Sequence, residues 1–133
     1  MTEENIAILH DRFPGIGGGE TFAIEAARVL DAPIYTMYVA GGTDIPSDIE
    51  VHTIRQDKYT NGISGRLLEW RNSGMNPLET TSVAIDMTQG TSELEAYDVL
   101  LESAPLSKYY VPATHQRIVH YPHSPPRWLY DLF

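Results

Sequence analysis

The sequence contains no cysteine and only two lysines, Lys58 and Lys108, among its 133 residues. Without cysteine the chain has no disulfide framework, no thiolate metal site and no cysteine nucleophile. Acidic residues outnumber basic residues by 18 to 9, which gives a formal net charge of −9. A protein that binds duplex nucleic acid presents a basic surface, so this composition argues against a nucleic-acid partner.

Long apolar segments are also missing. No stretch approaches the roughly 20 apolar residues that cross a bilayer, and the first residues, Met-Thr-Glu-Glu-Asn, do not resemble a secretory signal. These absences predict a cytoplasmic protein. The segment Arg66–Arg71 sets two arginines beside leucine and tryptophan. We favour a helix packed on a sheet with its arginines in solvent, and weak contact with the inner face of an anionic membrane is the alternative.

The chain does contain an alternation of strand-like and helix-like segments. The segments expected to form strands are Asn5–His10, Pro33–Val39, Ile49–Ile54, Tyr97–Leu101 and Arg117–Tyr121. The segments expected to form helices are Glu20 to the residue before Pro33, Gly62–Asn72, Asn76–Gln89 and Leu106–Val111, with a final helical turn near Pro126. This order predicts one α/β domain, residues 1–133, with a mostly parallel sheet.

Two details of this assignment can be checked. The residues expected on the buried face of the first helix are Phe22, Ala26, Val29 and Leu30. In Asn76–Gln89 the apolar residues at 83, 85 and 87 alternate, so a strand is a second interpretation of that segment.

Glycines gather between the first predicted strand and the first predicted helix, in Gly15-Ile-Gly-Gly-Gly-Glu20. An open α/β sheet binds anions at this place, because glycines let the backbone approach and the helix end presents free N–H groups. Gly17, Gly18 and Gly19 are therefore candidates for contact with a phosphate or a sugar. Glu20 stands where the dinucleotide-binding fingerprint requires its last glycine, and no Walker loop is present. A tight turn without a ligand is the alternative.

Arg12 is the positive charge nearest to these glycines. It could meet a phosphate, or it could be an ordinary surface arginine in solvent.

Three blocks of this sequence resemble glycosyltransferase family 4. Gly17-Gly-Gly-Glu20 is similar to the GG-x-E loop of that family, and Tyr97-Asp-Val-Leu-Leu-Glu-Ser103 is similar to its Y-D-V strand. The third block, His120-Tyr-Pro-His-Ser-Pro-Pro-Arg-Trp-Leu-Tyr-Asp131, resembles its Y-x-H-[ST]-P-P-R-Y-L-Y-D run. The blocks occur in the family's order and cover essentially the whole chain.

The resemblance implies the N-terminal half of a GT-B fold, in which two Rossmann-like domains face each other across a cleft. The N-terminal domain shapes the acceptor site, and the C-terminal domain holds most of the nucleotide-sugar donor. Such enzymes retain the anomeric configuration, need no metal and use no cofactor beyond the nucleotide-sugar substrate. The resemblance assigns Gly17 and Gly18 to the donor's phosphates and sugar, and His123 to the catalytic cleft. The further candidates are Gly19, Arg12 and Arg127 near the donor phosphates, and Glu20, Ser103 and Ser124 in the acceptor cleft.

The chemistry of the residues agrees in part with these roles. A neutral imidazole at His123 can hydrogen-bond a sugar hydroxyl and orient the reacting centre, and a histidine held by a backbone partner is the alternative. Arg127 can pair with a phosphate or with Asp131. His120 and Tyr121 are interpreted as packing residues of the last strand. The remaining histidines, which are given no role, are His10, His52 and His115.

The resemblance also implies a second domain. The donor-binding half of the family carries two regularly spaced glutamates, and no such pair is found here. We therefore expect the chain to act with a C-terminal GT-B domain or a separately encoded half, and to be inactive alone. The expected activity is hexosyl transfer to a glycan, lipid-linked or protein acceptor in cell-surface glycoconjugate synthesis. A non-catalytic binding or assembly module, and a small protein that binds nucleotides through its glycine loop alone, are the alternatives.

Overall fold

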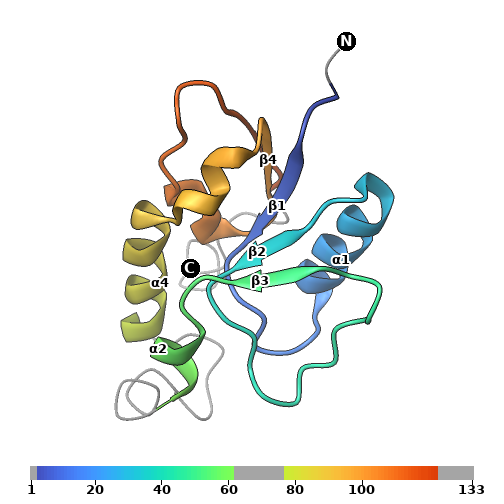
Figure 1. Ribbon diagram of the computed structural model, residues 1–133. Helices are drawn as coiled ribbons and strands as arrows, with labels where there is room; N and C mark the ends of the chain where they lie inside the picture. Colours follow the sequence, from blue (N-terminus) through green and yellow to red (C-terminus); the bar gives the residue numbers. More distant parts are fainter. Residues whose placement is uncertain (1–2, 62–76, 123–133) are drawn as a thin grey trace, which may run out of the picture.

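The computed structural model describes residues 3–61 and 77–122, and its core is a sheet of five parallel strands (Figure 1). The strands are β1 (Ile6–His10), β2 (Ile34–Thr36), β3 (Val51–Thr53), β4 (Val99–Glu102) and β5 (Arg117–His120). Their order across the sheet is β3-β2-β1-β4-β5. The chain runs outward in one direction through β2 and β3 and in the other through β4 and β5, so the topological switch point lies between β1 and β4. The predicted α/β, Rossmann-like architecture is confirmed.

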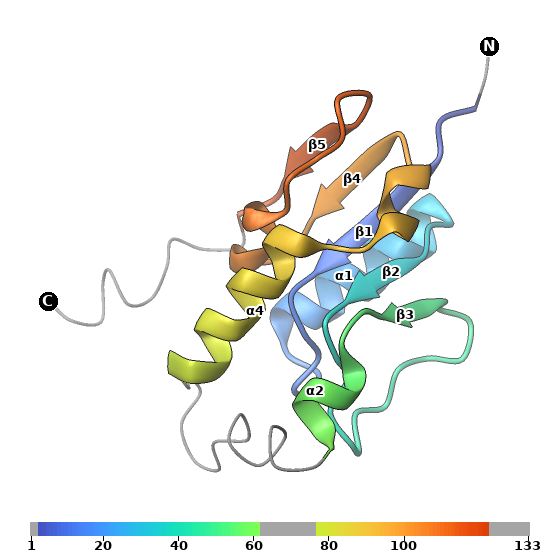
Figure 2. The ribbon, with the colours of Figure 1, turned by 60° about the vertical axis from the view of Figure 1, so that its left-hand side comes forward.

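Helices cover the two faces of the sheet, as Figure 2 shows. Helix α1 (Gly18–Leu30) packs on one face and lies behind the sheet in that view. The other face carries α2 (Gln56–Thr60), α4 (Pro77–Gln89) and two 3-10 helices, η1 (Ser92–Ala96) and η2 (Pro105–Tyr109).

The central strand β1 is apolar on both sides because both of its faces are covered. Ala7 and Leu9 join the cluster beneath α4, whereas Ile8 joins the cluster beneath α1. Successive side chains of a strand point to opposite faces, and a doubly covered parallel strand therefore appears as a continuous apolar run. The same alternation decides which polar residues meet at the end of the strand.

The face of α1 that packs on the sheet differs from the predicted one. Its buried residues are Ala23, Ile24 and Ala27, whereas Val29 is 82% exposed and Leu30 is also exposed. The prediction was wrong for Val29 and Leu30, because larger side chains were taken as the core, although two buried alanines let the helix lie close to the strands. Of the other two predicted residues, Ala26 packs against this core and Phe22 is half-buried. The helix also begins at Gly18 rather than Glu20.

The segment with two interpretations is a helix, since α4 spans Pro77–Gln89. Gly90 follows it with φ of 55°, and a Cβ added there would lie 3.0 Å from the ring of Tyr110, so this position requires glycine. The strands are shorter than predicted, and the helices α2 and η1 were not predicted.

The predicted helix Gly62–Asn72, which includes Arg66–Arg71, and the turn near Pro126 lie outside the described residues. In the parts of the chain that are described, no helix has the length and apolar character needed to cross a membrane.

Candidate site at the carboxyl edge of the sheet

Polar residues follow one another at the carboxyl ends of β1, β4 and β5, and the arrowheads of these strands point to the same edge of the sheet in Figure 2. They form two groups on opposite faces of the sheet. The group on the face of α1, here the α1-side cluster, consists of His10, Glu20 and Ser103. The group next to η2, here the η2-side cluster, consists of Asp11, Glu102 and His120. Both flank the switch point, where open α/β sheets bind ligands.

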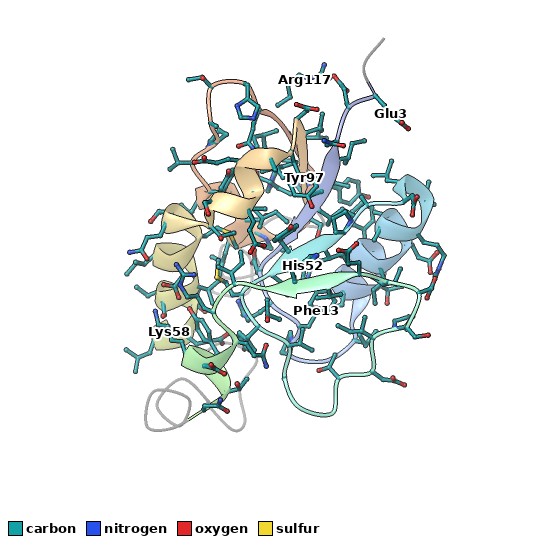
Figure 3. The ribbon with its side chains drawn as sticks, in the orientation of Figure 1. Glu3, Phe13, His52, Lys58, Tyr97 and Arg117 are labelled. Atoms are coloured by element: carbon teal, nitrogen blue, oxygen red, sulfur yellow. The ribbon has the colours of Figure 1, made fainter. Side chains whose placement is uncertain are left out.

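In the α1-side cluster, His10 joins the end of β4 to the first turn of α1. Its Nδ1 lies 2.7 Å from Ser103 Oγ, and its Nε2 lies 3.5 Å from Glu20 Oε1. Glu20 Oε2 in turn accepts a hydrogen bond of 3.0 Å from the N–H of Gly17. His10 and Ser103 are both buried, and the His10 ring packs against the ring of Phe13, which is labelled in Figure 3. A polar chain therefore runs from β4 through β1 to the glycine loop.

These contacts favour the ionised form of Glu20. Partial burial alone would raise the pKa of Glu20, but the His10 side chain and the backbone N–H groups of Glu20 and Gly17 together lower it. Ser103, by contrast, is fully buried and bonded to His10. In this arrangement its hydroxyl serves as a structural partner of the imidazole and not as an exposed nucleophile.

In the η2-side cluster, Glu102 and His120 are partners in the β4–β5 register. Glu102 Oε1 lies 3.2 Å from His120 Nδ1, and the His120 side chain is 35% exposed. Burial raises the pKa of Glu102 to about 7, and the nearby Asp11 carboxyl acts in the same direction. His120 is therefore the solvent-facing end of a pair whose inner member titrates near neutrality.

Asp11 is the second buried carboxyl of this cluster. Its Oδ2 accepts a hydrogen bond of 2.9 Å from the N–H of Leu106, but its Oδ1 is buried and finds no hydrogen-bond partner among the described residues. Burial raises the pKa of Asp11, although the Leu106 N–H and the neighbouring His10 and Arg12 oppose the rise. Two carboxyls that resist ionisation thus lie beside the switch point.

The glycine loop, Gly15–Gly19, follows β1 and runs into the first turn of α1, with Gly17 as the N-cap of the helix and Gly18 and Gly19 as its first two residues. None of these glycines has positive φ. A Cβ added at Gly15 or Gly18 would meet no described atom within 4 Å, and one added at Gly19 would lie at an ordinary 3.8 Å from the His10 ring. Neither backbone conformation nor packing explains glycine at Gly15 and Gly18, and no atom of the described residues occupies the space beside these two positions.

The structure contradicts the second interpretation of Arg12, an ordinary surface arginine in solvent. Its Nε lies 2.8 Å from Glu79 Oε1, with 19% of the arginine side chain exposed, and the same carboxylate oxygen accepts a hydrogen bond from the Tyr38 hydroxyl. Arg12 is therefore not a solvated surface residue. Arg12 forms an ion pair with Glu79 of α4, and this pair connects the segment before the glycine loop to that helix.

The remaining candidates from the sequence divide into two sets. Glu20 and Ser103 belong to the α1-side cluster, and Gly17, Gly18 and Gly19 begin α1. Three other candidates lie outside the described residues, namely His123, Ser124 and Arg127.

His120 was interpreted as a packing residue, and this was wrong, because its ring bonds to Glu102 and is partly exposed. The ring of Tyr121 does pack, since it stacks on Phe22 of α1 with 4.2 Å between ring centroids. This stack brings the end of β5 against the beginning of α1.

Sequence reasoning missed four members of the two clusters, namely His10, Asp11, Glu102 and His120. Each is a polar residue at the end of an apolar strand, where a parallel sheet gathers its ligand-binding residues. That position was the available signal, and it was applied only to residues that also belonged to a family motif.

No group of three or more potential metal-ligating side chains occurs within residues 3–61 and 77–122. Comparisons with protein-family models, with curated proteins and with solved structures found no match for this chain. Inference about its function therefore depends on its own residues and their arrangement.

Proposed function

We propose that this chain is the N-terminal, acceptor-side domain of a retaining glycosyltransferase similar to family 4. It would act with a donor-binding domain to move a sugar from a nucleotide sugar to a glycan, lipid-linked or protein acceptor. The observation that carries the proposal is the position of the Gly17–Glu20 motif, which forms the N-cap and first turn of α1, the helix that follows β1 beside the switch point.

The glycine loop is suited to a phosphate group. Thr21 is the first residue whose N–H bonds back along α1, to the carbonyl of Gly17, so the N–H groups of Gly18 and Gly19 have no partner within the helix. Free N–H groups and the positive end of the helix dipole attract anions. Because no side chain stands at Gly18, a diphosphate can approach this backbone closely.

The η2-side cluster, on the opposite face of the sheet, supplies groups that can hydrogen-bond sugar hydroxyls. Carboxylates and imidazoles both accept hydrogen bonds from hydroxyl groups, and His120 presents a partly exposed ring beside the buried Glu102. Strand β5 ends at His120, so the chain enters the His120–Asp131 block at this edge. The proposal assigns His123 of that block to the catalytic cleft, where its imidazole would orient the reacting sugar.

Titration of the ¹⁵N-labelled chain with uridine diphosphate and guanosine diphosphate tests the loop. The amide signals of Gly17, Gly18 and Gly19 should shift, whereas the corresponding nucleosides, which lack phosphates, should leave them unchanged. Gly18→Ala should weaken binding about tenfold, since one methyl group blocks the approach to the backbone. Gly41→Ala is the matched control, because its added Cβ also meets no described atom within 4 Å and its φ is not positive.

Loop signals that stay unchanged at millimolar diphosphate would contradict the proposal. Micromolar binding by the chain alone would instead favour a small nucleotide-binding protein, since most of a GT-B donor site lies in the other domain. A complex with a donor-binding domain that forms but turns over no nucleotide sugar would favour an assembly module.

A further inference from the structure

The α1-side cluster contains a buried histidine whose ring lies beside the glycine loop. His10 is 2% exposed and bridges two groups that belong to different parts of the fold. On one side is Ser103, which immediately follows β4, and on the other is Glu20 of α1. We propose that His10 is a positioning residue that holds the glycine loop in its ligand-ready shape by acting through Glu20.

The direction of the hydrogen bonds follows from the partners. A carboxylate can only accept, so an imidazole with a single proton carries that proton on Nε2, facing Glu20. Nδ1 then carries the lone pair and accepts the hydroxyl proton of Ser103, 2.7 Å away. The two neighbours thus select one tautomer of His10, and the ring is fixed from both sides.

The effect of His10 reaches the loop through one further contact. Glu20 uses Oε1 toward His10, at 3.5 Å, and Oε2 toward the N–H of Gly17, at 3.0 Å. This second contact is the reverse half of a capping box and fixes where the chain enters the helix. Because Gly17 has no side chain of its own with which to cap the helix, the loop depends on Glu20 for its position.

The alternative is that His10 only fills space beside Phe13 and stabilises the core without orienting the loop. The two roles differ in which ring nitrogen matters. An asparagine at position 10 places its polar atoms near the Nδ1 position and can keep the Ser103 contact. A glutamine reaches the Nε2 position and can keep the Glu20 contact. The two variants therefore separate the contact of residue 10 with Ser103 from its contact with Glu20.

Amide hydrogen exchange of the full chain is the first test. In His10→Asn the N–H of Gly17 should exchange about tenfold faster than in the wild type, because Glu20 has lost its partner. In His10→Gln it should stay within about twofold. The N–H of Leu100 in β4 serves as the internal reference for any general loss of stability. Equal acceleration of Gly17 in both variants, after correction by Leu100, would overturn the positioning role.

The ring itself supplies a second readout that does not depend on variants. The ¹⁵N shifts of His10 in the wild type should show the tautomer protonated at Nε2, and a neutral ring protonated at Nδ1 would refute the proposal. This inference relies on the proposed function only for the statement that the loop meets a ligand. Should exchange and tautomer behave as expected while diphosphates leave the loop unchanged, the positioning role would stand and the glycosyltransferase proposal would fail.

Discussion

The α1-side and η2-side clusters lie at the same strand ends, and His10 and Asp11, one from each, are neighbours in the chain. On the α1 side, the carboxylate of Glu20 is stabilised by its neighbours, and His10 has a partner at both ring nitrogens. On the η2 side, two buried carboxyls lie close to each other, and the Oδ1 of Asp11 has no partner among the described residues.

The carboxyl ends of β1 and β4 therefore carry two kinds of polar group, one with its hydrogen-bonding partners and one with raised pKa values. A satisfied polar group fixes geometry, whereas buried carboxyls with raised pKa values destabilise the ionised protein and are frequent at functional sites. The alternation of side chains along β1 and β4 directs the two kinds of group to opposite faces. The comparison therefore predicts opposite responses to substitution.

The largest expected effect is the loss of the His10 contacts. His10→Leu should reduce the free energy of unfolding by about 2 kcal/mol, because it leaves the buried Ser103 hydroxyl without its partner and frees Glu20. Urea denaturation at pH 8 measures this loss. His115→Leu is the matched control, since His115 is exposed and should change stability by less than about 0.5 kcal/mol. A free energy of unfolding for His10→Leu equal to that of the wild type would mean that the α1-side cluster does not stabilise the fold.

Substitution in the η2-side cluster should act in the opposite sense at neutral and higher pH. The pKa of Glu102 is raised from an ordinary 4.5 to about 7, so the folded state binds this proton more tightly than the unfolded state does. The resulting stability is fully present below pH 4.5 and is lost as the pH rises to about 7.

Glu102→Gln removes this titration. Above pH 7 the variant should be more stable than the wild type, by an amount on the order of 2 kcal/mol, and below pH 4.5 the two should agree. Urea denaturation as a function of pH gives the comparison. Parallel curves, with a constant difference across this range, would show that Glu102 ionises as freely in the folded chain as in the unfolded one.

The sequence was sufficient to predict the strands β1 and β4, because both are apolar runs flanked by residues that disfavour strands. It also predicted α4, because Asn76-Pro77 is typical of a helix N-terminus. The packing face of α1 could not be obtained in the same way. Its buried alanines are less hydrophobic than the exposed Val29, and only the closeness of the helix to the strands decides between them.

The site shows the same limit. The glycine loop was predicted as a local feature, since its residues are consecutive. The pairs His10–Ser103 and His120–Glu102 join residues that are 93 and 18 positions apart, and they exist because β1, β4 and β5 are adjacent in the sheet. Strand order, which local patterns do not contain, is what places these side chains together.

The smallest expected effect concerns the influence of Asp11 on the pKa of Glu102 within the η2-side cluster. Asp11→Asn keeps an acceptor for the Leu106 N–H but removes a negative charge near Glu102. Since burial is the larger cause of the raised pKa and the Asp11 charge the smaller one, the pKa of Glu102 should fall from about 7 while staying above its ordinary value of 4.5. Titration of the ¹³C carboxyl signal of Glu102 measures this change, with Asp57→Asn on the exposed surface of α2 as the control. An unchanged midpoint would show that the two carboxyls titrate independently, and burial of Glu102 alone would then account for the contrast between the clusters.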